Sequence, residues 1–240
     1  RWQKWILRKL KAVLPKALLI SGGGLSTTNN ELMFATTPVD ICVIGEGETA
    51  MLNICRGKVL PNGRVTVQEP NIKDLDALPF PAWDLLPMEI YLNNPIWGDD
   101  SGNSSQLPGV KVKRSMNVIT SRGCPYSCNY CYHLFGRGQY RQRSVDSVIA
   151  EVDSLIYRYN VDFIGFVDDN MMTSKGWMKH FCRKIAHKGI AWGCHGRTNN
   201  ADPEILGEMY QAGCRWGGYG IERGSPKILK AMNKKATVEQ

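Results

Sequence analysis

Apolar runs and amphipathic stretches alternate through the second half of the chain. From 145 to 159 the apolar residues recur every three or four positions, the period of a helix with one buried face, and Ser144 can cap its first turn. This alternation predicts four β/α units of a parallel α/β sheet. The predicted strands are 117–120, 162–167, 191–197 and 215–221, and the predicted helices are 145–159, 175–187, Asp202 to Gly213 and one that starts at Ser225.

The first half repeats this alternation in shorter elements. Residues 17–20 and 39–44 are predicted as buried strands, followed by the glycine turns SGGGLSTT and GEGE, and 49–56 is predicted as a helix. The run KVLPNGRVTV at 58–67 predicts a β-hairpin about its Pro-Asn-Gly turn. These elements indicate a small α/β unit ahead of the larger one.

An amphipathic helix with a basic, solvent-facing side is predicted at the start of the chain. Six of the 30 Lys and Arg residues precede the first acid, Glu31, so the net charge of +8 is concentrated there. Because a nucleic-acid surface would interleave basic residues through several elements, we expect neither nucleic acid nor a membrane as partner. The apolar residues of one helical face, which we expect to pack on the domain, are Trp2, Trp5, Ile6, Leu10, Val13 and Leu14.

Between 70 and 114 the periodic pattern gives way to a proline-rich segment that includes LPFPAWDLLPMEIY. Its prolines exclude a long helix, and its aromatic residues indicate packing on neighbours. We therefore predict three parts: a first domain at 1–69, an interdomain strap at 70–114 and a second domain at 115–240.

The apolar runs and the ends of the chain indicate its cellular location and whether it is a fragment. No apolar run reaches the roughly 18 residues of a membrane helix, and no signal peptide is visible, so a cytoplasmic protein is expected. Because the first residue is Arg1 rather than methionine and the last follows closely on a helix, we expect the chain to be a fragment.

Three of the eight cysteines, Cys124, Cys128 and Cys131, cluster in SRGCPYSCNYCYH directly after the predicted strand 117–120. A disulfide framework would need a smaller, loop-rich secreted chain. Three thiolates on a four-iron cluster leave one iron free, which is useful when a second ligand must bind there. A structural zinc site completed by His133 is the alternative. The remaining cysteines, expected to be buried and inert, are Cys42, Cys55, Cys182, Cys194 and Cys214.

Polar residues follow the other predicted strands of the second domain. Asp168 and Asp169 come after the second strand, Arg197 ends the third and Glu222 follows the fourth. Parallel strands joined by right-handed crossovers have their carboxyl ends at one edge of the sheet. We therefore expect these side chains and the cysteines to form one site.

The CxxxCxxC motif, with Tyr130 just before its last cysteine, resembles that of the radical S-adenosylmethionine (radical SAM) superfamily over about residues 115–240. The resemblance implies a 4Fe-4S cluster on Cys124, Cys128 and Cys131. It also implies S-adenosylmethionine on the free iron, cleaved reductively to a 5′-deoxyadenosyl radical.

The same resemblance implies roles for the other residues of the site. Asp168 and Asp169 would contact the amino group of S-adenosylmethionine, Arg197 its carboxylate, Glu222 the ribose hydroxyls, and Tyr130 would lie near the adenine. Arg223 stands where the GIESGS segment of the family has a serine, which alters the contacts around Glu222. Catalytic residues stay unassigned.

The stretches ISGGGLS and VDICVIGEGETA resemble the carboxyl-terminal half of the cobalamin-binding domain of one radical SAM branch, and the strap resembles the linker of that branch. Glycines allow close approach of the backbone to a ligand, so Ser21, Gly22, Gly23 and Gly24 would border the nucleotide tail of cobalamin. The DxHxxG signature of many such domains does not occur in this sequence, and we assign no cobalt ligand.

The fold class implied is α/β: a truncated Rossmann-like cobalamin-binding domain, then the first four units of a partial (β/α)6 radical SAM barrel. The function implied is a cobalamin-dependent radical SAM enzyme that abstracts hydrogen and transfers a methyl group to an unactivated carbon of a small-molecule or natural-product-type substrate. An external one-electron donor would be its partner. One alternative is a radical SAM methylthiotransferase acting on tRNA. Another, from a different class, is a zinc-stabilised RNA-binding module.

Overall fold

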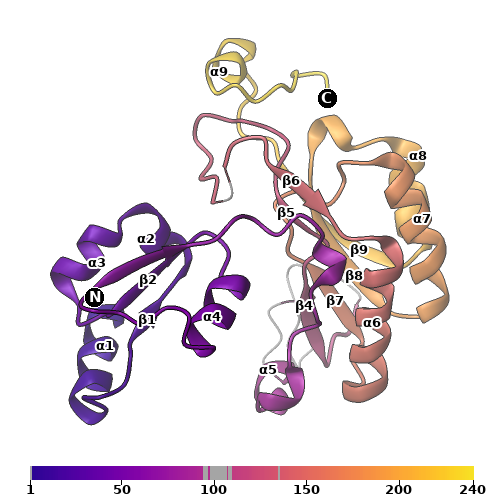
Figure 1. Cartoon of the computed structure of the whole chain (residues 1–240). Coiled ribbons are helices and arrows are strands. Elements are labelled where there is room, and N and C mark those ends of the chain that lie inside the picture. Colours follow the sequence, from indigo (N-terminus) through magenta and orange to yellow (C-terminus); the bar gives the residue numbers. More distant parts are fainter. Residues whose placement is uncertain (1, 94–96, 98–106, 108–109, 135) are drawn as a thin grey trace. The chain divides into compact units, whose positions relative to one another are not determined.

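The structure, a computed structural model, describes the chain except for residues 1, 94–96, 98–106, 108–109 and 135. Its contacts divide the chain into two compact units, Arg1–Lys73 and Asp74–Gln240. Figure 1 shows both units with their labelled elements. Each unit is described by itself.

Three short parallel strands form the sheet of the first unit, in the order β1-β2-β3. The strands are β1 Ile20–Ser21, β2 Ile41–Ile44 and β3 Val65–Gln68, and the helices between them are α2 Gly23–Thr28, α3 Asn30–Thr36 and α4 Glu48–Cys55. The predicted hairpin at 58–67 is wrong, because α4 returns the chain to the amino edge of the sheet and β3 then pairs parallel with β2. The predicted glycine turn SGGGLSTT, residues 21–28, contains the whole of α2 and is mostly helical.

Helix α1, Trp2–Val13, confirms the predicted first helix but not its packing face. Its one buried side chain is Leu7, whereas Trp2 is 72% exposed and most of the predicted face is exposed with it. Lys11 lies one turn after Leu7 and forms an ion pair with Asp40, with Nζ 2.8 Å from Oδ2. The contacts of Leu7 and Lys11 therefore decide which face is inward.

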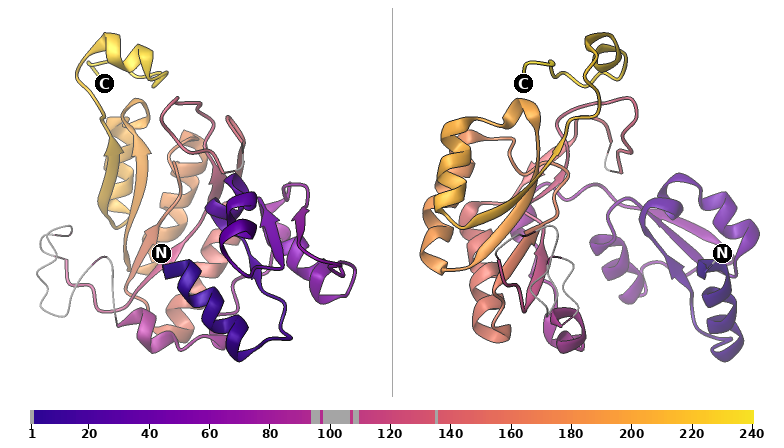
Figure 2. Two further views of the ribbon diagram at one scale, coloured as in Figure 1. Left: turned by 90° about the vertical axis from the view of Figure 1, so that its left-hand side faces the viewer. Right: turned by 180° about the vertical axis from the view of Figure 1, so that it is seen from behind.

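Four parallel strands form the main sheet of the second unit, in the order β4-β7-β8-β9. Helices α6, α7 and α8 lie along one face of this sheet (Figures 1 and 2). The succession of four predicted β/α units is confirmed. None of the helices among the described residues is both long and apolar enough to cross a membrane. The strands are β4 Ser115–Val118, β7 Phe163–Phe166, β8 Ala191–Arg197 and β9 Cys214–Gly220, and the helices are α6 Val145–Tyr159, α7 Lys175–Ile185, α8 Pro203–Gln211 and α9 Pro226–Ala231.

A two-stranded antiparallel ribbon, β5 Ser121–Gly123 with β6 Tyr140–Gln142, follows β4 and was not predicted. Ser121 pairs with Gln142 and Gly123 with Tyr140. The ribbon thus closes the base of the loop that carries the three motif cysteines.

The two faces of the main sheet are filled differently. On the helix side Phe166, Phe181 and Trp192 are fully buried, and the ring centroids of Phe181 and Trp192 lie 5.2 Å apart, edge to face. On the opposite face Trp97 packs against Phe163 and Trp216, with centroids 5.5 and 4.8 Å away. The sheet is therefore apolar on both sides at the level of these residues, as expected for a parallel sheet.

The described part of the predicted strap, from Asp74 on, belongs to the second unit. It contains the one-turn helices Leu75–Ala77 and Trp83–Leu85 and the helix α5, Met88–Leu92. Met88 and Leu92 are buried in the core beneath α6, α7 and α8. Part of the strap lies outside the described residues.

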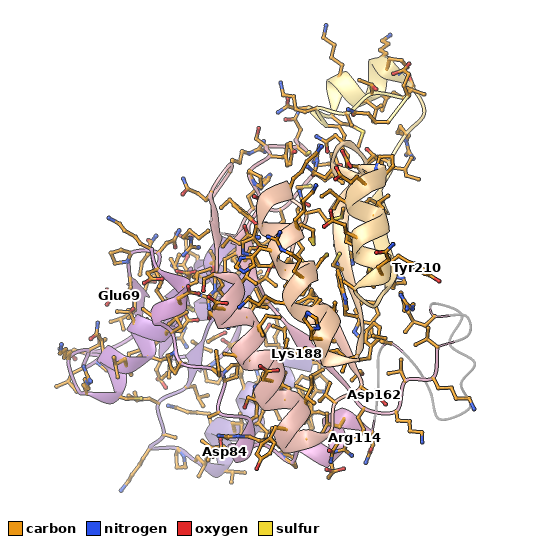
Figure 3. The ribbon with its side chains drawn as sticks, turned by 90° about the vertical axis from the view of Figure 1, so that its right-hand side faces the viewer. Glu69, Asp84, Arg114, Asp162, Lys188 and Tyr210 are labelled. Atoms are coloured by element: carbon orange, nitrogen blue, oxygen red, sulfur yellow. The ribbon has the colours of Figure 1, made fainter. Side chains whose placement is uncertain are left out.

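Arg114, just before β4, fastens α5 to the amino edge of the main sheet. Its guanidinium forms an ion pair with Glu89 at 2.8 Å, and its Nε donates to the carbonyl oxygen of Tyr159 at 2.7 Å. Its backbone N–H donates to Oδ1 of Asp162 at 3.0 Å, and Arg114 and Asp162 lie side by side in Figure 3. These contacts place Arg114 at the end of the sheet opposite to the strand carboxyl ends.

Gly165→Ala tests the packing of Trp97 on the face of the sheet opposite to helices α6, α7 and α8. A Cβ at 165 would lie 2.1 Å from Nε1 of Trp97, so the indole must leave its place against Phe163 and Trp216. We expect the free energy of unfolding to fall by about 1–3 kcal/mol, measured by urea titration. Gly176→Ala in α7, where a Cβ meets no atom within 4 Å, is the control and should not lose stability. Equal urea midpoints for the two variants would contradict this packing.

Candidate active site

The carboxyl ends of β4, β7, β8 and β9 lie along one edge of the sheet, called the rim below. The pairing shows this register, since Val118 lies opposite Phe166 and Arg197 opposite Gly220. Arg197 is the last residue of β8, and the loops that leave the rim carry the other predicted residues of this unit: Cys124, Cys128, Cys131, Tyr130, Asp168, Asp169 and Glu222.

The three motif cysteines are free thiols with graded exposure. Cys128 is 1% exposed, Cys124 is half-buried and Cys131 is exposed. Burial raises the pKa of Cys124 and of Cys131, and the charge of the neighbouring Cys128 raises both further. Three thiolates this close together therefore need a positive centre, such as iron, to be stable.

The donor set of the cysteine loop fits a four-iron cluster. The thiolates of such a cluster bind separate irons and do not converge on one point. Within the described parts of the chain, no three His, Cys, Asp or Glu side chains converge as ligands of a single ion. Nε2 of His133 lies 3.3 Å from the carbonyl oxygen of Cys128, so this ring contacts the loop backbone. The three thiols therefore suit a cluster with one open iron, and a zinc site completed by His133 stays the alternative.

A segment far along the chain holds the cysteine loop in place. The backbone N–H of Asn129 donates to the carbonyl oxygen of Met232 at 3.0 Å, and its side-chain amide donates to that of Ala231 at 3.0 Å. Nδ2 of Asn233 donates to the carbonyl oxygen of Ser127 at 2.9 Å. The residues after α9 therefore form a clasp, Ala231–Lys234, on the loop. No sequence motif indicated this contact.

Arg197 points at the cysteine loop and is only 7% exposed. Its Nη1 donates to Sγ of Cys128 at 3.2 Å, its Nη2 to the carbonyl oxygen of Lys234, and its Nε to Oδ1 of Asn199 at 3.3 Å. The guanidinium carbon lies 3.8 Å from the ring centroid of Tyr126. The contact of Arg197 with the carboxylate of S-adenosylmethionine stays a prediction, and in this structure the guanidinium is hydrogen-bonded to Cys128, Lys234 and Asn199.

Of the two adjacent acids, Asp168 is committed to the fold. It is 3% exposed, and its Oδ1 accepts from the backbone N–H and hydroxyl of Thr120, each at 3.0 Å, and from the hydroxyl of Ser121 at 2.5 Å. Burial raises the pKa of Asp168, and these hydrogen bonds oppose the rise. Asp169 is exposed, and its charge raises the pKa of the nearby Cys124. Asp169 is therefore the acid that is open to a ligand.

Glu222 and Tyr130 are joined by a buried lysine that sequence analysis missed. Lys234 is 3% exposed, and its Nζ lies 3.0 Å from Oε1 of Glu222 and 3.1 Å from the hydroxyl of Tyr130. The hydrogen bond from Lys234 holds the pKa of Glu222 below its usual value. Burial raises the pKa of Tyr130, and the charges of Cys128 and Glu222 add to the rise. The only sequence signal was a Lys-Lys pair, which resembles an ordinary solvated turn.

The backbone at Glu222 is also unusual. Its φ is +65°, a left-handed conformation that is uncommon for a residue with a side chain. Gly220 lies close beside it, since a Cβ at 220 would come within 2.6 Å of Oε1 of Glu222. The turn after β9 thus fixes where this carboxylate lies.

The glycine loop of the first unit, Gly22 to Gly24, follows β1 and includes the first two residues of α2. Gly22, Gly23 and Gly24 are exposed, and Gly23 has a φ of +81° with no atom within 4 Å of a Cβ placed there. Ser21 is buried, with its hydroxyl 2.8 Å from that of Ser26. The glycines can therefore approach a ligand closely, while Ser21 fixes the start of the loop.

The five scattered cysteines are not uniformly buried, as had been predicted. Cys42, Cys182 and Cys194 are buried, but Cys55 is exposed and Cys214 is half-buried. Cys55 is the last residue of α4, and Cys214 begins the last described strand of the sheet. Terminal and edge positions cover a side chain on fewer sides than the core does.

Comparison with known proteins shows the family of this chain. Residues 118–240 match the family model of the radical SAM superfamily. An uncharacterized methyltransferase of Pyrococcus horikoshii is 30% identical over 96% of this chain and 50% of its own length. The anaerobic magnesium-protoporphyrin IX monomethyl ester cyclase of Rubrivivax gelatinosus is 27% identical over 98% of this chain and 44% of its own length.

Solved structures show the same fold. The radical S-adenosylmethionine methyltransferase TsrM from Kitasatospora setae, with tryptophan substrate and a SAM analog bound, aligns with a TM-score of 0.67 at 19% identity, over 98% of this chain and 47% of TsrM. The TsrM structure with cobalamin and a [4Fe-4S] cluster bound aligns with a TM-score of 0.64 at 19% identity, over 96% of this chain and 48% of TsrM.

This chain spans about half the length of the curated relatives it matches. The family model covers the cysteine loop and all later strands of the main sheet, and the relatives extend the similarity across the first unit. The predicted superfamily is thereby confirmed: the chain belongs to the radical SAM superfamily, in the branch of these relatives.

Proposed function

We propose that this chain is the cofactor-binding part of a cobalamin-dependent radical SAM methyltransferase that acts on an unactivated carbon of a small molecule. The observation that carries the proposal is the set of three free thiols on the rim, one of them in contact with a buried arginine. Methyltransferases and cyclases both occur among its relatives. Methyl transfer is the reaction we propose, with an external one-electron donor.

On the rim, Cys124, Cys128 and Cys131 would hold a 4Fe-4S cluster and leave one iron for S-adenosylmethionine. When bound, this cluster supplies the electron that cleaves S-adenosylmethionine to a 5′-deoxyadenosyl radical, and cobalamin supplies the methyl carrier. Asp169 is exposed beside Cys124 and would accept a hydrogen bond from the methionine ammonium.

Glu222 and Tyr130 would bind the nucleoside half of S-adenosylmethionine. The ion pair with Lys234 keeps Glu222 ionised, so its free lone pairs can accept hydrogen bonds from ribose hydroxyls. Tyr130 is 44% exposed, its hydroxyl is held by Lys234, and Nζ of Lys234 lies 5.8 Å from the ring centroid, so the exposed part of the ring would lie against an adenine.

In the first unit, the glycine loop would border cobalamin. Gly22, Gly23 and Gly24 present exposed backbone at the carboxyl end of β1, where open α/β sheets bind ligands. Ser21 would act indirectly, since its hydroxyl is engaged with Ser26. The similarity to TsrM over both units supports this assignment as a matter of fold.

Replacing the buried cysteine tests the cluster. We expect Cys128→Ala, reconstituted without oxygen, to lose nearly all of about four irons and four sulfides per chain, together with the brown absorbance. Cys55→Ala removes an exposed thiol of the first unit and should keep them. Metal analysis of the wild type would contradict the proposal if it found one zinc ion and no iron. Two clusters without cobalt would instead indicate a methylthiotransferase.

Asp169→Asn tests the proposed contact with the methionine ammonium. Because the amide oxygen of Asn accepts a hydrogen bond without the negative charge, we expect S-adenosylmethionine to bind about tenfold more weakly to the cluster-loaded chain. The side chain is exposed, so the thermal midpoint should not change. Asp146→Asn, which removes an acid paired with Lys184 on the helix side, is the matched control for calorimetric titration. Wild-type affinity in Asp169→Asn would refute the contact.

A further inference from the structure

Arg197 is a buried cation without a buried anion beside it. Among the residues described by the structure, no Asp or Glu forms an ion pair with Arg197, and Glu222 is itself paired with Lys234. The acceptors of its three nitrogens are a thiol sulfur, a carbonyl oxygen and an amide oxygen. A buried charge is costly unless it is paired. The hydrogen bond from Lys234 and, to a smaller extent, the charge of Arg197 lower the pKa of Glu222, but the ion pair of Glu222 is with Lys234. The fold therefore buries the guanidinium of Arg197 without an ion pair of its own among the described residues.

The sulfur of Cys128 is the group that can become this partner. It is a predicted cluster ligand, and its side chain is 1% exposed, so the contact with Nη1 at 3.2 Å is shielded from water. A thiolate that binds iron carries the negative charge that the guanidinium lacks. The hydrogen bond then becomes charge-assisted on both sides.

The orientation of Arg197 is fixed independently of this sulfur. The ring of Tyr126 lies under the guanidinium, and its hydroxyl accepts from Nδ2 of Asn199 at 3.1 Å, while Asn199 in turn accepts from Nε of Arg197. The carbonyl oxygen of Lys234, in the clasp, accepts from Nη2. Arg197 therefore does not need Cys128 in order to be placed.

We propose that Arg197 is a positioning residue for the cluster, which holds the Cys128 ligand and raises the reduction potential of the cluster. Hydrogen bonds to the ligand sulfurs and nearby charge are among the factors that set such potentials. A reduced cluster carries one more negative charge, so a fixed cation and a donated hydrogen bond stabilise it more than the oxidised form. The inference rests on the proposed function, because it presupposes the cluster.

The experiment is a redox titration of the anaerobically reconstituted full chain in the absence of S-adenosylmethionine. The reduced cluster is monitored by electron paramagnetic resonance. The variants are Arg197→Gln and Arg197→Lys. Arg114→Gln is the matched control, since it removes the same charge at the opposite end of the sheet. Iron and sulfide contents and the melting of the metal-free protein are measured for every variant.

We expect Arg197→Gln to reduce the ratio of reduced to oxidised cluster at least tenfold at the wild-type midpoint. That change corresponds to a potential about 59 mV more negative for a one-electron couple. Arg197→Lys keeps the charge but cannot bridge Cys128 and the clasp together, so a smaller shift is expected. The cluster of Arg114→Gln should have the midpoint potential of the wild type.

An Arg197→Gln cluster with the wild-type potential would overturn the inference. If this variant binds no cluster but melts like the wild type when metal-free, the role in holding the ligand is supported. If it neither binds a cluster nor melts normally, Arg197→Lys decides, and an unchanged potential there overturns the inference. A wild-type chain without any cluster is a separate outcome, because it refutes the proposed function itself.

Discussion

The contact between the buried guanidinium of Arg197 and the sulfur of Cys128 is the interaction on which the rim depends. It joins the end of β8 to the cysteine loop, and the second nitrogen of the same guanidinium joins both to the clasp at Lys234. Because the cysteine loop is long and has little regular structure, such contacts rather than a ladder of backbone hydrogen bonds give it one conformation. Lys234 of the clasp also holds Glu222 and Tyr130 in place, because its ammonium contacts both side chains.

The two ends of the main sheet have opposite character. At the amino end, aromatic rings and the ion pair of Arg114 close the structure, and Gly165 leaves room for the indole of Trp97. At the carboxyl end the side chains are polar, charged or thiol-bearing, and several are exposed. This division is expected when stability is built at one end of parallel strands and chemistry at the other. It explains why the candidate residues could be placed at one edge of the sheet before their contacts were known.

Local pattern was sufficient for much of this fold. The apolar period of α6 gave its bounds, and Ser144 caps it as predicted, because both depend on neighbours within a turn. The errors fell where distant partners decide. The inward face of α1 is set by the burial of Leu7 and the ion pair of Lys11 with Asp40. Strand β3 pairs parallel with β2, although residues 58–67, which include the start of β3, resemble a hairpin. Lys234 is buried through residues 12 and 104 positions away, which no local pattern contains.

The two adjacent acids after β7 have different surroundings and therefore different roles. Asp168 is buried, whereas the next residue, Asp169, is exposed, so the two carboxylates lie in different surroundings. Asp168 turns inward and accepts the hydrogen bonds of Thr120 and Ser121, which join the ends of two neighbouring strands. Asp169 is left exposed beside Cys124. Asp168 is therefore a structural acid, which holds the residues just before the cysteine loop in place. Asp169 is the acid that is available to a ligand near that loop.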